Sequence, residues 1–106
     1  MKKRILLVAA ALIILSPGLS LAETSSIELG KQLFNDPTLG GSTNSKTCNS
    51  CHDNGSGLEK SGDNQNLVKM INKCIEGPLA GKAIDGRTAP MRSLKMYIQS
   101  LGNQPN

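Results

Sequence analysis

Two cysteines and a histidine, in the order C-x-x-C-H, constrain the fold of this chain more than any other feature of its sequence. They are Cys48, Cys51 and His52 of the segment TCNSCH. On a helical turn, positions i, i+3 and i+4 project from one side, so the two thiols and the imidazole would point the same way. The thiols can then add to the two vinyl groups of a porphyrin while the imidazole binds its iron. We therefore expect Cys48 and Cys51 to carry one covalent haem c, with His52 as its proximal iron ligand.

Two other kinds of site use the same residue types. A thioredoxin-like redox pair also contains C-x-x-C, but it lies at the start of a helix in a βαβ unit, and no strand pattern precedes Cys48. A structural zinc site could combine the three residues of the motif with Cys74. Zinc would then take ligands from the adjacent positions 51 and 52, which suits a tetrahedral centre poorly. Covalent haem attachment agrees best with the sequence.

The N-terminal segment has the three parts of a secretory signal peptide. Basic residues at positions 2–4 are followed by an apolar run over residues 5–15 and by the segment SLA, which ends at Ala22. The apolar run has 11 residues, whereas a membrane-spanning helix needs about 20. We therefore expect a signal peptide at residues 1–22, cleaved after Ala22. The haem domain over residues 23–106 would be exported to the periplasm, without stable insertion in a membrane.

The charge of the chain does not indicate nucleic-acid binding. The sequence has 12 basic and 8 acidic residues, a formal net charge of +4. Three of the basic residues and none of the acidic ones lie in the predicted signal peptide, so the predicted domain has a net charge of only +1. Since a nucleic-acid-binding domain carries a larger basic excess, we expect no nucleic-acid partner.

The predicted domain has few bulky side chains with which to fill a core. Aromatic residues make up 2% of the sequence, namely Phe34 and Tyr97. Polar, glycine-rich stretches on both sides of the C-x-x-C-H motif are typical of loops. Long loops in a small domain are difficult to stabilise through side-chain contacts alone. A large, flat, apolar haem would supply the missing core.

Three further segments have the sequence pattern of helices, and no segment alternates for long enough to predict a strand. The first lies within SSIELGKQLFNDP, with Ser25 or Ser26 as its N-cap. The apolar face of the second, over residues 67–76, consists of Leu67, Met70, Ile71, Cys74 and Ile75. The buried face of the third, from about Pro90 to Gly102, consists of Leu94, Tyr97, Ile98 and Leu101. The expected fold is all-α, with three to four short helices around the haem.

Several residues are candidates for the sixth position on the iron. His52 is the only histidine, so the ligand is a methionine, Cys74 or a lysine, or else the site is open. We predict Met91 as the distal ligand, because it lies at a loop-to-helix junction 39 residues after His52, from where a loop could bring it across the haem. Met96 is expected to point away from the buried face of the last helix, and Met70 to pack in the core. Cys74 is expected to be a small buried hydrophobe, with thiolate ligation of the iron or an intermolecular disulfide as the alternatives.

With these residues placed, the sequence resembles the small monohaem class I c-type cytochromes from about Glu28 to Gly102. The segments that carry the resemblance are ELGKQLF, TCNSCH and MRSLKMYIQSLG. The resemblance implies a cytochrome c-like fold in which the first and last helices cross. The residues that would meet at this crossing are Gly30, Phe34, Leu94 and Tyr97.

Two segments are also similar to parts of dihaem proteins. The segment INKCIEGPLAGKAIDGRTAPMRSLKMYIQSL is similar to the haem domains of thiosulfate-oxidising cytochromes, in which a comparable run ends in a ligand methionine. The segment GKQLFNDPTLGG before TCNSCH is similar to the first haem domain of bacterial dihaem cytochrome c peroxidases. This sequence departs from both families because it has a single attachment motif, so we expect one haem.

These expectations favour a periplasmic electron-transfer protein over an enzyme. One electron would be carried on a haem with His52 and Met91 as axial ligands, and full coordination would exclude oxygen and peroxide. Because the one histidine is already used, no distal acid–base group is expected. We therefore predict no enzymatic activity and transient contacts with redox partner proteins. The alternatives are a haem c subunit of, or electron acceptor for, a larger oxidoreductase, for example in sulfur-compound oxidation, and an open-site haem enzyme or sensor.

Overall fold

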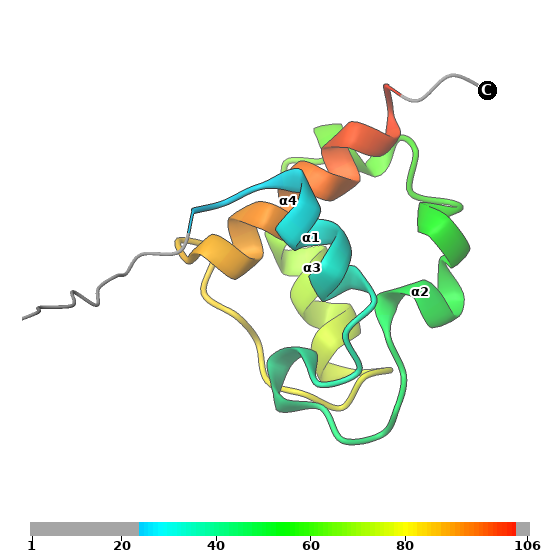
Figure 1. Ribbon diagram of the computed structural model, residues 1–106, viewed down its shortest axis with the longest axis vertical. Coiled ribbons are helices and arrows are strands. Elements are labelled where there is room, and N and C mark those ends of the chain that lie inside the picture. The colour runs from blue at the N-terminus through cyan, green and yellow to red at the C-terminus, as the bar shows by residue number, and fades with distance from the viewer. Residues whose placement is uncertain (1–23, 104–106) are drawn as a thin grey trace, which may run out of the picture.

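The computed structural model describes residues 24–103 as four α-helices joined by irregular segments (Figure 1). The helices are α1 (Ile27–Phe34), α2 (Cys48–Cys51), α3 (Leu67–Glu76) and α4 (Ala89–Leu101). Three 3-10 turns lie between them, at Leu39–Gly41, Asp53–Gly55 and Ser61–Asp63. No strand occurs in this part of the chain, so the predicted all-α class is confirmed.

The predicted signal peptide and its cleavage after Ala22 lie outside the described residues. Within residues 24–103, none of the helices combines the length and the apolar character needed to cross a bilayer.

Helix α1 begins at a serine cap. The side chain of Ser26, rather than that of Ser25, accepts a hydrogen bond from the backbone N–H of Leu29 at 2.9 Å. Such a bond satisfies one of the N–H groups that have no partner within the helix. The helix ends at Phe34, and Pro37 follows shortly afterwards, as the sequence predicts.

Helices α1 and α4 pack directly against each other, because a glycine lets their backbones approach (Figure 1). A Cβ at Gly30 would collide with the carbonyl oxygen of Ser93. The Ser93 hydroxyl in turn accepts a hydrogen bond from the backbone N–H of Ser26 at 3.0 Å. The rings of Phe34 and Tyr97 meet edge to face, with centroids 5.1 Å apart. The predicted crossing of the first and last helices is confirmed.

Helix α4 begins with Thr88 as its N-cap and has Pro90 in its first turn. The predicted face is buried, since Leu94, Tyr97, Ile98 and Leu101 are each at most 5% exposed. The helix presents this face to α1 and to the rest of the core.

Helix α3 has the predicted bounds, but its apolar residues are divided between two surroundings. Leu67, Ile71 and Ile75 are buried in the core. Met70 and Cys74, predicted on the same buried face, are exposed. The expectation that they pack in the core is therefore wrong. Because they are four residues apart, Met70 and Cys74 lie on the same side of the helix. This side borders the core and is not part of it.

The segment between α3 and α4 is irregular, as predicted, and an amide side chain of α3 holds its second half. Asn72 of α3 donates through Nδ2 to the carbonyl oxygen of Ile84 at 3.0 Å. It also accepts the backbone N–H of Ile84 at 2.8 Å. This pair of bonds fixes the path of the chain toward the start of α4.

Candidate functional site

The C-x-x-C-H motif forms a single capped helical turn. The Thr47 hydroxyl accepts the backbone N–H of Ser50 at 3.1 Å, and the Ser50 hydroxyl accepts the backbone N–H of Thr47 at 2.9 Å. This reciprocal capping box defines the start of α2. Cys48 and Cys51 are the first and last residues of the helix, and His52 is its C-cap.

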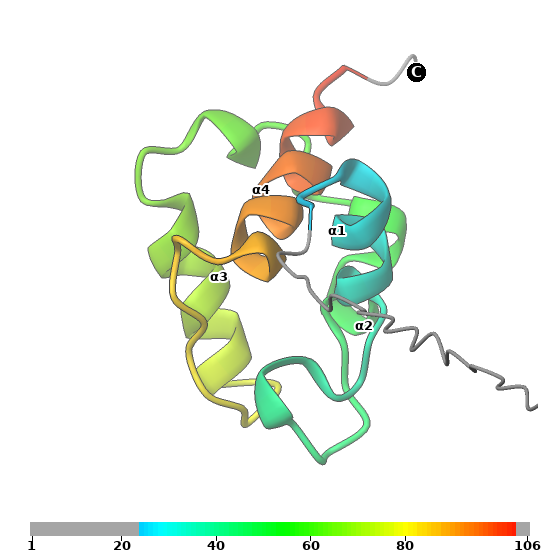
Figure 2. The same cartoon turned by 60° about the vertical axis from the view of Figure 1, so that its left-hand side comes forward.

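All three residues of the motif line one cavity of about 400 Å³. Helices α2, α3 and α4 all contribute residues to its wall. In Figure 2, α4 lies between α3 on one side and α2 on the other. Apolar side chains make up most of the remaining wall: Phe34, Leu58, Leu67, Met70, Ile71, Pro78, Leu79, Leu94 and Ile98. The volume lies in the range of small-molecule and cofactor sites, which are mostly apolar with a few polar groups.

The imidazole of His52 is oriented by the loop that follows it. Its Nδ1 lies 3.0 Å from the carbonyl oxygen of Ser56. Because a carbonyl can only accept a hydrogen bond, Nδ1 carries the proton, and Nε2 keeps its lone pair for a metal. Gly57, next along the chain, has a φ of 88°, a conformation that glycine adopts without strain. The ring therefore has the tautomer that an iron ligand requires.

The cysteines are free, and the surroundings of Cys48 disfavour its thiolate. Burial, together with the nearby Cys74, raises the pKa of the Cys48 thiol to about 11. Cys51 is exposed at the end of the same helical turn. Two free thiols at the cavity fit the formation of two thioethers, and together with the apolar walls and the oriented imidazole they suit a haem c.

The alternative of a zinc site finds no support. In residues 24–103, no group of three or more histidine, cysteine or acidic side chains is arranged to hold a metal ion. The thioredoxin-like alternative lacks its βαβ setting, since this part of the chain contains no strand.

The structure does not bring Met91 to the cavity. Its side chain is 0% exposed, belongs to the hydrophobic core and is not among the residues that line the cavity. The placement does not support the prediction that Met91 is the distal ligand. Met96 lies beside a separate shallow groove with Arg92 and Lys95, away from the cavity, as predicted.

Two sulfur-containing side chains line the cavity, although the sequence predicts them in the core. Met70 and Cys74 both line it from α3. Helical periodicity identifies an apolar face, but it does not tell whether protein or a cofactor covers that face. The low aromatic content of the sequence was the sign that part of this apolar surface contacts a cofactor rather than protein.

Comparison with known proteins identifies a family. The family model for di-haem cytochrome c peroxidase matches residues 24–99. No curated protein and no solved structure matches the chain. The matched family agrees with the similarity of GKQLFNDPTLGG to such peroxidases. It is a family of enzymes, which overturns the prediction that the chain has no enzymatic activity.

Proposed function

Because the chain belongs to the di-haem cytochrome c peroxidase family, we propose that it is an exported haem c domain that delivers single electrons in a peroxidase-type reaction. The family binds haem and has a redox role, and the fold is an all-α cytochrome fold. The observation that carries the proposal is the position of Cys48, Cys51 and His52 together at one apolar cavity.

Different residues of this cavity would attach the haem, bind its iron and cover its ring. Cys48 and Cys51 would be linked to it through thioethers. His52 would bind the iron through Nε2, with Ser56 holding the ring by its other nitrogen. The apolar side chains of α3 and α4 would cover the ring and exclude water. When bound, the haem supplies one-electron redox chemistry.

The lining of the cavity favours electron delivery over cleavage of peroxide at this site. Apart from His52, none of the lining residues is a histidine, an acid or a base with a charged side chain. Cleavage of peroxide needs a group that can move a proton within hydrogen-bonding reach. An iron that only exchanges electrons does not need such a group.

The electron count agrees with this role. Reduction of one hydrogen peroxide to two waters consumes two electrons and two protons. The sequence has one C-x-x-C-H motif, so we propose one haem, which stores one electron. The domain would then deliver electrons in two separate steps, or act together with a second haem of the enzyme. Brief contacts with redox partners suit repeated delivery.

Location is part of the proposal. The signal peptide predicted at residues 1–22 would direct the domain to the periplasm, where thioether formation takes place on the exported chain. The predicted net charge of +1 for the domain gives no support for binding nucleic acid.

Redox titration of the purified holoprotein tests the proposal. The haem bands should change reversibly with potential in a single one-electron transition. His52→Ala should abolish or strongly displace this transition, because it removes the proximal ligand. Arg87→Gln, which changes an exposed side chain away from the cavity, is the matched control and should leave it unchanged. A holoprotein whose haem cannot be reduced and reoxidised reversibly would contradict the proposal.

A further inference from the structure

The side chain of Met70 is exposed on the wall of the cavity. It is 40% exposed, and within residues 24–103 only Ile27 is a comparably exposed large hydrophobic residue. Ile27 is not at the cavity, whereas Met70 lines it from α3. An apolar side chain in this position gains most if something in the cavity covers it.

A neighbouring amide orients the sulfur of Met70. Asn64 donates from Nδ2 to Sδ of Met70 at 2.8 Å. The Oδ1 of the same amide accepts the backbone N–H of Asn66 at 2.7 Å, which fixes which end of the amide faces the sulfur. A thioether sulfur has two lone pairs, so one can accept from Asn64 while the other remains free for a metal.

One loop contacts both Met70 and His52. In the segment between α2 and α3, the Ser56 carbonyl holds Nδ1 of His52, and the Asn64 amide holds Sδ of Met70. Both side chains line the cavity, Met70 from α3 and His52 from the C-cap of α2. Helices α2 and α3 lie on opposite sides of α4 (Figure 2). The same short stretch of chain therefore fixes a nitrogen ligand on one side and a sulfur on the other.

The other sulfur atoms are less well placed. Met91 is enclosed in the core, and Met96 lies beside the separate groove. Cys74 lines the cavity, but its thiol is near that of Cys48, on the side where a thioether would form. Met70 lies one helical turn away from Cys74, toward the loop that holds His52.

From these contacts we propose that the thioether of Met70 is the distal iron ligand and that Asn64 is a positioning residue for it. The inference rests on the proposed function, since it requires a haem bound at His52. It replaces Met91 as the ligand and gives the exposed sulfur of α3 a function.

Spectroscopy of the oxidised holoprotein tests this ligand. Ligation by methionine gives a weak charge-transfer band at the red end of the visible spectrum. Met70→Leu should abolish the band and allow the reduced protein to bind carbon monoxide. The matched control is Met91→Leu, which nearly conserves core volume and changes a residue that does not line the cavity. It should retain the band and exclude carbon monoxide.

The role of Asn64 has its own readout. Asn64→Leu removes the donor to the sulfur and should shift both the methionine band and the reduction potential. Asn64→Gln retains an amide donor and should restore them in part. An unchanged band and potential in Asn64→Leu would exclude the positioning role.

Haem content separates the two proposals. If the wild-type chain carries a haem and Met70→Leu keeps the methionine band, the ligand assignment is wrong and the proposed function stands. A thiolate spectrum that disappears in Cys74→Ala would overturn the assignment in the same way. If the wild-type chain carries no haem at all, the proposed function itself fails.

Discussion

The geometry of His52 depends on single residues outside the helix that precedes it. Helix α2 ends at Cys51, and His52 already has a non-helical backbone, with φ −126° and ψ 70°. The Ser56 carbonyl oxygen holds its ring through Nδ1. The sequence predicted that the three residues of the motif act together, because their spacing is a local property. It could not predict the hydrogen bonds that orient the ring, since these depend on the path of a loop.

The surroundings of Met70 also could not be predicted from local sequence. Its sequence position predicts the apolar side of a helix, and that much is correct. Whether the apolar side chain meets protein or a cofactor depends on the distance between α2 and α3, which no local pattern encodes. Asn64, which donates to its sulfur, lies six residues earlier in a stretch that reads only as a polar loop.

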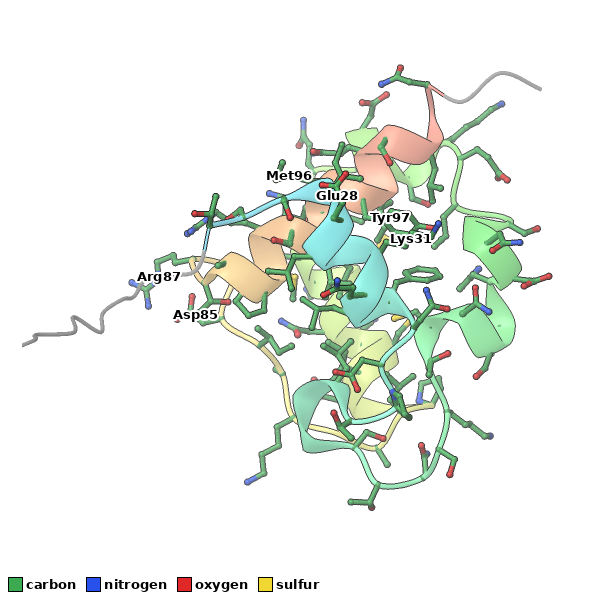
Figure 3. The ribbon with its side chains drawn as sticks, in the orientation of Figure 1. Glu28, Lys31, Asp85, Arg87, Met96 and Tyr97 are labelled. Atoms are coloured by element: carbon green, nitrogen blue, oxygen red, sulfur yellow. The ribbon has the colours of Figure 1, made fainter. Side chains whose placement is uncertain are left out.

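One exposed ion pair gives a prediction at this scale. Arg87 donates through Nε and Nη2 to the two carboxylate oxygens of Asp85, at 3.0 and 2.7 Å (Figure 3). These side-chain hydrogen bonds, and a further one from the Arg87 backbone N–H, lower the pKa of Asp85 well below its ordinary value of 3.8. The folded state thus favours the ionised carboxylate. Its contribution to stability is present above the ordinary pKa and is lost as pH falls through the lowered one.

Arg87→Gln should therefore raise the pKa of Asp85 toward its ordinary value, as followed by NMR titration of the carboxyl carbon. Lys82→Gln, which removes another exposed positive charge of the same segment, should leave it in place. A pKa that does not move in Arg87→Gln would show that the hydrogen bonds are absent in solution.

At the scale of elements, the crossing of α1 and α4 is the contact that the sequence predicted best. The resemblance to class I c-type cytochromes implied that Gly30 and Phe34 of the first helix meet Leu94 and Tyr97 of the last. The structure adds the Ser26 to Ser93 hydrogen bond, which ties the start of α1 to the middle of α4. By contrast, the bounds of α3 were predicted correctly, but the burial of its apolar residues was not. All of them were predicted to be buried, whereas Met70 and Cys74 line the cavity.

The crossing gives a prediction about stability. Gly30→Ala would place a methyl group against the backbone carbonyl of Ser93, which cannot move without shifting α4. We expect the free energy of unfolding to fall by about 3 kcal/mol, the upper part of the usual range for overpacking. Urea denaturation of the holoprotein measures this change. Gln32→Ala, at an exposed position of the same helix, should change stability by less than about 0.5 kcal/mol. Equal stability of the two variants would show that the helices are farther apart in solution.

At the scale of the whole molecule, a small core surrounds a cavity that the chain does not fill by itself. The scarcity of aromatic residues and the long loops predicted this arrangement, because they left too little apolar bulk for a closed interior. The cavity walls come from all four helices and from the loops between them. Its shape was beyond sequence reasoning, since it depends on how elements far apart in the chain pack together. The prediction of no enzymatic activity was wrong, because one C-x-x-C-H motif and one histidine do not reveal that the domain belongs to a family of enzymes.

The intact mass of the purified chain shows whether a haem is covalently attached at Cys48 and Cys51. We expect a red protein whose mass is that of the polypeptide without residues 1–22 plus one haem, retained after denaturation because the link is covalent. Replacement of both cysteines, Cys48→Ser with Cys51→Ser, should remove the added mass, whereas Cys74→Ser should keep it. A colourless wild-type protein with the mass of the bare polypeptide, obtained from a host that attaches haem to other chains, would contradict the account.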